Sequence, residues 1–280
     1  MTALITPFTE DGVDFDALVR IAQGAARRSS SLVALGTTAE TCTLGDDEQD
    51  AVVRCLLGHF SLPLVVGVSG NDTRRVVRNA LHWQEMGAAA LLCITPYYNR
   101  CNAHGLTAHY EAICRAVDVP VILYNVPSRT GVNIPTELLP QLLALPHVAG
   151  IKEASADPRQ IMGDAVACAR ADKALLCGED ALLPLFRAVG AAGAVSAAAN
   201  AIPDVMADAL SLPMAAMPRW TETYYPLVDS LFADVNPICV KQACYHLGLC
   251  RNILRLPLTA RHDDAVARRL AACGFAIVMD

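Results

Sequence analysis

A short apolar run, Val148-Ala149-Gly150-Ile151-Lys152-Glu153, has the length of a buried β-strand and ends in a charged pair. Lys152 is one of three lysines in the chain. An ammonium is costly to remove from water, so a lysine at this point needs ionic partners or must lose its proton. A neutral lysine amine is a nucleophile that can form an imine with a carbonyl substrate. The alternative is a side chain that extends to solvent or pairs with Glu153 or Glu179.

Seven further apolar runs of this kind recur along the chain at intervals of roughly 20–30 residues. Stretches with helical spacing lie between them, such as Asp16–Gln23, Arg74–Met86 and Asp180–Val189. Eight strands that alternate with helices predict an α/β protein with a parallel sheet, and eight strands close a (β/α)8 TIM barrel in about 250 residues. The seven runs are Ala3–Ile5, Leu32–Leu35, Leu64–Gly67, Ala90–Ile94, Val121–Asn125, Ala174–Gly178 and Ala194–Ser196.

The pattern becomes helical after Asn200. The expected helices cover Pro203–Leu212, Pro218–Phe232, Pro237–Leu247 and Asp263–Cys273, and a proline suits the first turn of a helix. We therefore predict a barrel over residues 1–212 and a small C-terminal helical region over residues 213–280.

The composition is that of a globular protein, because 54% of the 280 residues are hydrophobic and 18% are charged. The formal net charge of −6 argues against nucleic acid or an anionic membrane surface as the main partner. We find neither a signal peptide nor a run long enough to span a bilayer, so we expect a cytoplasmic protein.

The eleven cysteines include no Cys-x-x-Cys pair. We expect buried free thiols at Cys55, Cys93, Cys114, Cys168 and Cys273, which have apolar neighbours.

Reactive side chains follow several predicted strands at the point where each strand ends. They belong to Gly36–Glu40, Thr95–Arg100, Tyr124–Gly131, Lys152 and Gly178–Asp180. In an α/β barrel the active site lies at the C-terminal ends of the strands. We therefore expect these segments to form one site.

The chemistry of these side chains fits imine formation. Tyr124 can move protons while the amine of Lys152 adds to a ketone and water leaves. The hydroxyl and backbone N–H groups of Thr37 and Thr38 can bind a carboxylate, because a glycine-led loop that enters a helix favours an anion. Arg129 offers a planar fork for a second carboxylate.

Each of these residues also has a purely structural interpretation. Tyr124 can be an ordinary barrel tyrosine with a satisfied hydroxyl, and Arg129 can form a surface ion pair. Thr38 or Thr41 can cap a helix. Their joint occurrence at matching strand ends favours the catalytic interpretation.

Four motifs together resemble the dihydrodipicolinate synthase family, now called the 4-hydroxy-tetrahydrodipicolinate synthase family. They are Gly-Thr-Thr-x-Glu at 36–40, Thr-Pro-Tyr-Tyr-Asn at 95–99, Tyr-Asn-Val-Pro-Ser-Arg-Thr-Gly at 124–131 and Gly-Ile-Lys-Glu-Ala-Ser at 150–155. The resemblance continues through Asn236-Pro237-Ile238 to Leu254–Leu258, so it covers essentially the whole chain. It implies a class I pyruvate-dependent lyase that condenses pyruvate with L-aspartate 4-semialdehyde in lysine and diaminopimelate biosynthesis.

The resemblance also implies catalytic roles for individual residues. Lys152 forms the Schiff base with pyruvate, and this imine takes the place of a cofactor or metal. Tyr124 relays protons, and Thr37 links Tyr124 to Tyr98. Tyr98 reaches into the active site of a neighbouring subunit, which implies a homotetramer built as a dimer of dimers.

The remaining residues that the resemblance implies bind the substrates. Thr38 holds the pyruvate carboxylate, and Arg129 receives the carboxylate of aspartate semialdehyde. Gly178 and Val195 line the pocket through backbone contacts.

Two positions depart from the family pattern. Ala39 stands where the family usually has glycine, and alanine would be strained there if the position needs a positive φ. Arg75 aligns with a glutamate of the allosteric site in lysine-inhibited relatives, and Asp46 and Gln49 align with histidines. Because Arg75 would repel the ammonium of lysine, we predict weak or no inhibition by lysine. An activity assay that shows inhibition at submillimolar lysine would contradict this prediction.

Other functions would leave specific signs in the sequence. No His-Glu-x-x-His occurs, and His104 and His109 are not spaced as neighbouring ligands on one helix face, which disfavours a zinc-dependent aldolase. No glycine-rich phosphate loop follows a strand, so nucleotide binding has no support. Two alternatives stay open: a sister lyase that acts on a sialic acid or a keto-deoxy sugar acid, and a catalytically silent pyruvate-binding paralogue. Arg129 favours the synthase over the sister lyase, because a carboxylated aldehyde needs a cation.

Overall fold

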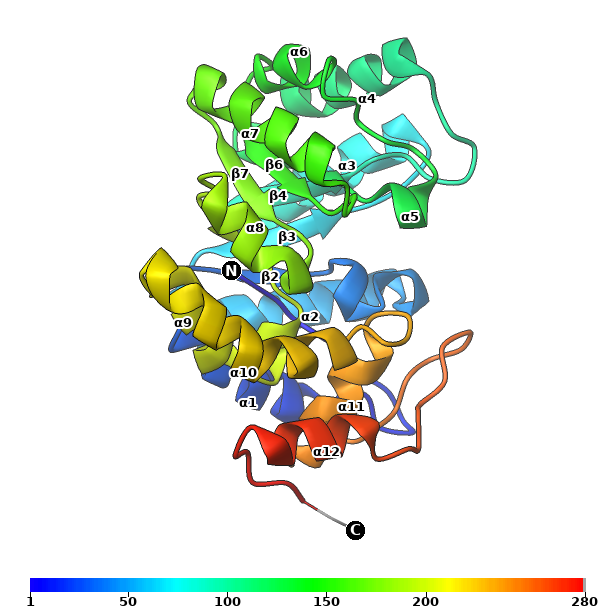
Figure 1. Cartoon of the computed structure of the whole chain (residues 1–280). Helices are drawn as coiled ribbons and strands as arrows, with labels where there is room; N and C mark the ends of the chain where they lie inside the picture. Colours follow the sequence, from blue (N-terminus) through cyan, green and yellow to red (C-terminus); the bar gives the residue numbers. More distant parts are fainter. Residues whose placement is uncertain (279–280) are drawn as a thin grey trace. The chain divides into compact units, whose positions relative to one another are not determined.

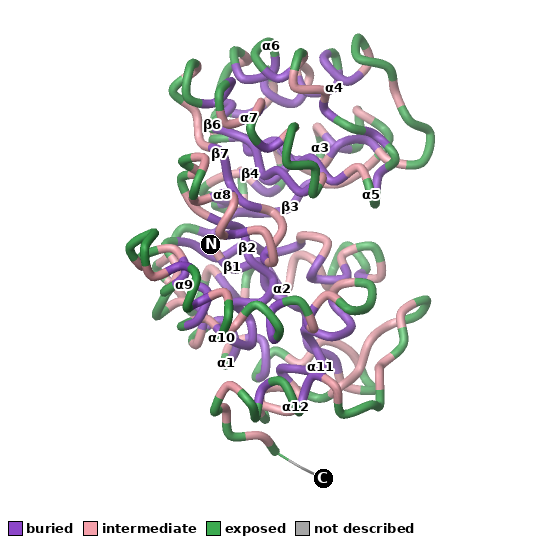
Figure 2. Tube along the Cα trace, in the orientation of Figure 1, coloured by how far each residue is buried: buried purple, intermediate pink, exposed green. Residues whose placement is uncertain are grey.

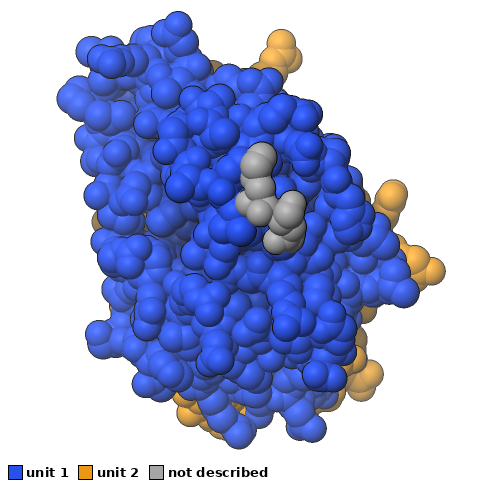
Figure 3. Space-filling model, turned by 90° about the horizontal axis from the view of Figure 1, so that it is seen from below, with its two compact units in different colours: residues 1–62, 196–280 blue, residues 63–195 orange. Residues whose placement is uncertain are grey.

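The computed structural model describes residues 1–278. The chain divides into two compact units, which Figure 3 colours separately. Unit 1 consists of Met1–Leu62 together with Ser196–Asp280, and unit 2 consists of Pro63–Val195. The boundary at residue 212 between a barrel and a C-terminal region stays a prediction.

Unit 2 is built on parallel strands. They are β3 (Leu64–Val68), β4 (Ala90–Ile94), β5 (Val121–Asn125), β6 (Val148–Glu153), β7 (Ala174–Cys177) and β8 (Gly193–Ala194). Each strand pairs in parallel with the next, and their residues are mostly buried (Figure 2). Helices cover parallel strands in α/β proteins, so these strands are continuous apolar runs rather than alternating ones.

Unit 1 contributes the first two strands, β1 (Thr2–Ala3) and β2 (Leu32–Ala34), which also pair in parallel. The N–H of Ala3 donates to the carbonyl of Ser196 at 2.8 Å, and the N–H of Ser196 donates to the carbonyl of Met1 at 3.0 Å. The strand order in the sheet is β1 to β8. Parallel strands in chain order with helices between them are the arrangement of a (β/α)8 barrel. The predicted fold class is confirmed.

The helices of unit 2 begin at sequence signals that are visible in the chain. The carboxylate of Asp72 accepts a hydrogen bond from the N–H of Arg74 at the start of α3, and Asp157 accepts one from Arg159 at the start of α7. Except for α5, which follows the end of β5, these helices lie against the strands of the unit (Figure 1). They are α3 (Thr73–Met86), α4 (Ala103–Ala116), α5 (Pro127–Thr130), α6 (Leu139–Leu143), α7 (Pro158–Ala171) and α8 (Leu183–Ala188).

The helices of unit 1 include one that is largely buried. All residues from Ile238 to Cys244 of α11 are buried, including Lys241. The helices are α1 (Phe15–Ala26), α2 (Asp46–His59), α9 (Pro203–Ser211), α10 (Met217–Ser230), α11 (Ile238–His246) and α12 (Ala265–Ala272). The helical character predicted after Asn200 is therefore confirmed. Across residues 1–278, none of the helices is both long and apolar enough to cross a membrane.

Several elements differ in their bounds from the sequence prediction, and the first strand covers Thr2–Ala3 instead of Ala3–Ile5. The last strand covers Gly193–Ala194 instead of Ala194–Ser196, because a run of small residues marks its own ends poorly. The helix predicted over Asp180–Val189 begins as a 3-10 turn and becomes α-helical at Leu183, where a proline occupies the first turn. Proline suits the first turn of an α-helix, because its missing N–H would have no partner there.

The eleven cysteines are all free thiols. Cys93, Cys114 and Cys168 are buried as predicted, and burial raises the pKa of the Cys114 thiol to about 11. The prediction was wrong for Cys55 and Cys273, which are partly exposed. Cys55 lies beside the buried face of α2 rather than on it, and Cys273 lies at the end of α12.

Candidate active site

Lys152 and Tyr124 are opposite residues on the neighbouring strands β6 and β5. The amine nitrogen of Lys152 lies over the ring of Tyr124, 4.2 Å from the ring centroid. Each residue is 6% exposed. The side chain of Lys152 therefore does not extend to solvent, and its amine is held beside a phenol that can exchange protons.

Glu153 faces the opposite side of β6 from Lys152, because successive side chains of a strand alternate. Its carboxylate accepts hydrogen bonds from the side chains of Asn125 at 2.8 Å and Gln160 at 3.3 Å. It also accepts one from the N–H of Ser155 at 2.5 Å. An ion pair with Glu153 is thus not what holds the amine of Lys152 in place.

Gly178 follows β7 and lies against the backbone of β6. Its N–H donates to the carbonyl of Glu153 at 2.8 Å. A Cβ atom at this position would stand 2.8 Å from that carbonyl oxygen, 2.9 Å from the Cβ of Ala154 and 3.0 Å from the Cγ of Lys152. The position therefore requires glycine, because any side chain would push on the stem of Lys152.

Arg129 is carried by α5, a four-residue helix that directly follows β5. The buried hydroxyl of Thr130 fixes this turn, since it accepts a hydrogen bond from Thr95 at 2.9 Å and donates one to the carbonyl of Val132 at 2.9 Å. Gly131 ends the helix with a φ of 68°, and a Cβ there would be 3.0 Å from the Nε of Arg100. The guanidinium of Arg100 thus packs against the turn that carries Arg129. Arg100 is a second cation at this turn, and the sequence analysis did not single it out.

Tyr98 projects from the surface of unit 2. It follows β4, has a positive φ of 68° and is 89% exposed. Its neighbour Asn99 fastens the loop by donating to the carbonyl of Asn71 at 3.1 Å. An exposed aromatic side chain held on a fixed loop is suited to contact another molecule.

The loop over Gly36–Thr41 in unit 1 is built from two 3-10 turns. Thr38 is buried, and the hydroxyl of Thr41 donates to the carbonyl of Gly36 at 2.9 Å. The helix-capping role considered for Thr38 or Thr41 is wrong. The residue before α2 is Gly45, and neither threonine caps that helix.

Ala39 is not strained, although it stands where the family usually has glycine. It lies in the turn Thr37–Ala39, and the positive φ of this loop, 53°, belongs to Glu40. Ala39 is 2% exposed, so its methyl group fills space in the loop. The position therefore accepts alanine in this backbone.

The structure thus places Lys152 next to both Tyr124 and Gly178. Arg129 and Tyr98 follow strands of the same unit. Val195, 2% exposed, follows β8 and donates its N–H to the carbonyl of Cys177 at 2.9 Å. Thr37 and Thr38 lie in unit 1. Within the described residues there is no group of three or more metal-binding side chains.

A family model described as the dihydrodipicolinate synthetase family matches residues 1–272. The chain belongs to this family. A 4-hydroxy-tetrahydrodipicolinate synthase from Archaeoglobus fulgidus is 38% identical over 267 residues, which cover 94% of this chain and 92% of that protein. The structure of dihydrodipicolinate synthase from Thermotoga maritima is similar with a TM-score of 0.92 at 31% identity, covering 98% of this chain and 97% of that one. The chloride-inhibited dihydrodipicolinate synthase from Acinetobacter baumannii, complexed with pyruvate, gives a TM-score of 0.91 at 31% identity and covers 98% of each chain.

This family member also has a buried polar network behind β6 that the sequence analysis missed. Thr136 donates to one oxygen of Asp164 at 2.8 Å, while the other oxygen accepts from no donor in the described residues. Burial and then the side chain of Glu153 raise the pKa of Asp164 to about 8. Burial therefore favours the protonated form of Asp164, which lies directly behind the strand that carries Lys152.

Asp164→Asn is expected to stabilise the protein increasingly as the pH rises. The folded protein holds the Asp164 proton up to about pH 8, whereas an unperturbed aspartate releases it near the ordinary pKa of 3.8. The free energy of unfolding of the parent therefore falls as the pH rises between these values. An asparagine presents the same donor at every pH, so the gain at pH 8 should be on the order of 1–3 kcal/mol.

Denaturant unfolding of both proteins at pH 5, 6.5 and 8 measures this difference. Asp118→Asn, at an exposed position on a loop, is the matched control and should leave the free energy of unfolding nearly unchanged. A difference in the free energy of unfolding between Asp164→Asn and the parent that does not widen with pH would contradict the raised pKa of Asp164.

Proposed function

We propose that this protein is a 4-hydroxy-tetrahydrodipicolinate synthase, a lyase that condenses pyruvate with L-aspartate 4-semialdehyde. The observation that carries the proposal is the buried amine of Lys152, 4.2 Å from the ring centroid of Tyr124. Support comes from the relatives, since the Archaeoglobus fulgidus protein bears this name and the Acinetobacter baumannii structure is a complex with pyruvate.

The reaction begins at the amine of Lys152. Its lone pair attacks the ketone carbon of pyruvate, and the carbonyl oxygen leaves as water to give an imine. Tyr124 exchanges the protons that this dehydration needs. The imine withdraws electrons from the neighbouring methyl group, which loses a proton and becomes the nucleophile for the aldehyde. The protein's own amine thereby does the work of a cofactor.

The remaining residues bind and orient the two substrates. Thr38 holds the carboxylate of pyruvate, Arg129 receives the carboxylate of the aldehyde, and Gly178 and Val195 line the pocket with their backbone. The guanidinium of Arg100 beside the α5 turn adds positive charge next to Arg129, which favours an anionic aldehyde over a neutral sugar.

The proposed assembly is a homotetramer in the cytoplasm. The 89% exposed Tyr98 supports a partner subunit at this surface, because a proton-relay tyrosine has no use in bulk solvent. In this assembly Tyr98 reaches the active site of a neighbouring subunit and meets Thr37, which links it to Tyr124.

Reductive trapping tests the proposal directly. The protein is incubated with pyruvate and borohydride, digested, and searched by mass spectrometry for the adduct. We expect one adduct, on Lys152, and turnover of aspartate semialdehyde. An adduct with turnover of sugar aldehydes alone would instead show a sister lyase, and the absence of any adduct would show a catalytically silent protein.

Arg129→Ala is expected to raise the KM for aspartate semialdehyde by roughly 10–100-fold while pyruvate trapping stays nearly unchanged. The reason is that a charge-assisted hydrogen bond to a carboxylate contributes about 1.5–3 kcal/mol. Steady-state kinetics with each substrate varied in turn measures the effect. Arg159→Ala, which removes another exposed arginine of unit 2, is the control. A loss of pyruvate trapping in Arg129→Ala would show that this arginine binds the other substrate.

A further inference from the structure

The loop over Gly36–Thr41 is fastened by residues from the far end of the chain. Glu40 connects its two 3-10 turns in a left-handed conformation, with φ 53° and ψ 35°. A residue other than glycine is uncommon in this conformation and costs roughly 1–2 kcal/mol there. The loop therefore needs contacts that hold Glu40 in place.

A buried ion pair supplies the first of these contacts. One carboxylate oxygen of Glu40 lies 2.5 Å from the amine of Lys241, and the two side chains are 1% and 0% exposed. The amine of Lys241 also donates to the carbonyl of Ile253 at 3.0 Å and lies 4.0 Å from the ring centroid of Phe8. A buried pair with this many additional partners fixes its geometry, since either charge alone would be costly to bury.

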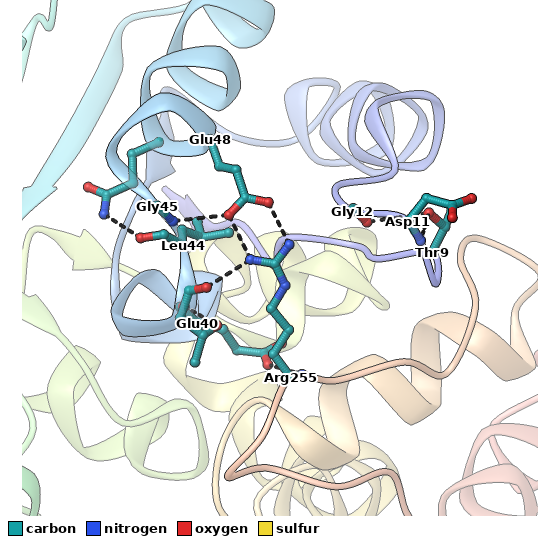
Figure 4. A network of polar contacts seen from close by, with 10 residues as sticks. Thr9, Asp11, Gly12, Glu40, Leu44, Gly45, Glu48 and Arg255 are labelled. Atoms are coloured by element: carbon teal, nitrogen blue, oxygen red, sulfur yellow. Dashed lines mark hydrogen bonds and ion pairs between the residues drawn. The ribbon is translucent and has the colours of Figure 1, made fainter.

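Arg255 holds the second oxygen of the same carboxylate (Figure 4). Its N–H donates to Glu40 at 3.1 Å, and its guanidinium donates to the carbonyl of Thr43 at 2.8 Å. The guanidinium also forms two hydrogen bonds with Glu48, at 2.7 and 2.5 Å, and these lower the pKa of Glu48. Both oxygens of Glu40 are thus occupied, and the loop is fixed to the segment that follows α11.

Asn236 makes the contact that bears on binding. Its side-chain NH2 group donates to the hydroxyl oxygen of Thr38 at 2.9 Å. A threonine hydroxyl has one proton to give and two positions at which it can accept. Because Asn236 occupies an accepting position, the proton of Thr38 is left to donate elsewhere.

We propose that Asn236 is a positioning residue that makes the Thr38 hydroxyl a hydrogen-bond donor toward the carboxylate of the keto acid. The inference rests on the proposed function, in which Thr38 binds that carboxylate. The anchored Glu40 fixes the place of the loop, and Asn236 fixes the direction of the Thr38 proton. Asn236 does not itself touch the substrate in this arrangement.

Asn236→Asp and Asn236→Ala separate this role from a structural one. The aspartate would accept the Thr38 proton and place a negative charge behind it, so the KM for pyruvate should rise roughly 10–100-fold with kcat changed less than about threefold. The alanine leaves the proton undirected, and the KM should rise roughly 3–10-fold. Asn252→Ala removes a hydrogen bond to Arg261 in the same C-terminal segment and should leave the KM unchanged.

A double-mutant cycle with Thr38→Val provides the decisive readout. If Asn236 acts through Thr38, then Asn236→Ala should have almost no further effect on the pyruvate KM once the hydroxyl is gone. Additive effects of the two substitutions, or an unchanged KM in both Asn236 variants, would overturn the proposal. Thermal unfolding of each variant accompanies the kinetics, and if the aspartate variant does not fold, the alanine cycle decides.

Borohydride trapping in the parent protein distinguishes a failure of this inference from a failure of the proposed function. A parent that forms a borohydride-trapped adduct at Lys152, together with Asn236 variants that trap at the same half-saturating pyruvate concentration, would overturn the role of Asn236 alone. A parent that forms no adduct would overturn the proposed function and the role of Asn236 with it.

Discussion

Lys152→Ala is expected to abolish the pyruvate adduct and to reduce turnover to the background rate. No other lysine in the chain is placed to replace it, because Lys241 is paired with Glu40 and Lys173 lies on the turn before β7. Loss of a nucleophile removes the covalent route entirely, and losses on the order of 10⁶-fold in kcat are known for nucleophiles of other enzymes. Intact-mass spectrometry after borohydride treatment measures the adduct, and a coupled assay measures turnover.

Two matched variants sharpen this experiment. Lys152→Arg keeps a long cationic side chain but cannot form the imine, so it should be as inactive as the alanine variant. Lys173→Ala removes one of the other two lysines and should trap pyruvate like the parent. An adduct in Lys152→Ala, or turnover in Lys152→Arg above a few percent of the parent, would show that the imine forms elsewhere or is not needed.

The barrel could be predicted from the sequence because its strands are continuous apolar runs. Residues Val148–Glu153 and Val121–Asn125 form strands with the predicted bounds. A strand buried on both faces needs apolar residues at every position, and this leaves a signal that local inspection detects. The contact between Lys152 and Tyr124 follows from the same signal, since the two residues occupy corresponding places near the ends of neighbouring strands.

The contacts that hold the Gly36–Thr41 loop could not be predicted in this way. Asn236 and Thr38 are 198 residues apart in the sequence, and Arg255 and Glu48 are 207 apart. Pairs at such separations leave no periodic pattern, because each partner is a single polar residue in a segment with its own local preference. Lys241 illustrates this, since it is a lone lysine in a helix and yet is fully buried.

The raised pKa of Asp164 could not be predicted for a different reason. Two acidic residues separated by a turn and part of a helix are usually solvated, so the sequence favours charged carboxylates on the surface. Both are instead fully buried between β6 and α7. The tertiary packing raises the pKa of Asp164, and the pattern of residue types does not show this.

Tyr124→Phe is expected to lower kcat by roughly 10²–10⁴-fold, the range for a lost general acid–base group. The phenylalanine keeps the ring whose centroid lies 4.2 Å from the amine nitrogen of Lys152, so the packing around the lysine stays intact. The hydroxyl alone is removed, and with it the group that exchanges protons during imine formation. Single-turnover trapping should therefore be slow in this variant, and yet it should reach the same final extent as in the parent.

Tyr110→Phe is the matched control for the loss of a buried hydroxyl. Tyr110 is fully buried in the same unit, and its hydroxyl donates to the carbonyl of Cys93 at 3.2 Å. Its removal should cost about 1 kcal/mol of stability and leave kcat within about threefold of the parent. If Tyr124→Phe and Tyr110→Phe reduce kcat equally, the hydroxyl of Tyr124 is structural and the protons of imine formation move through another group. A large loss confined to Tyr124→Phe would place the proton transfer at the phenol beside Lys152.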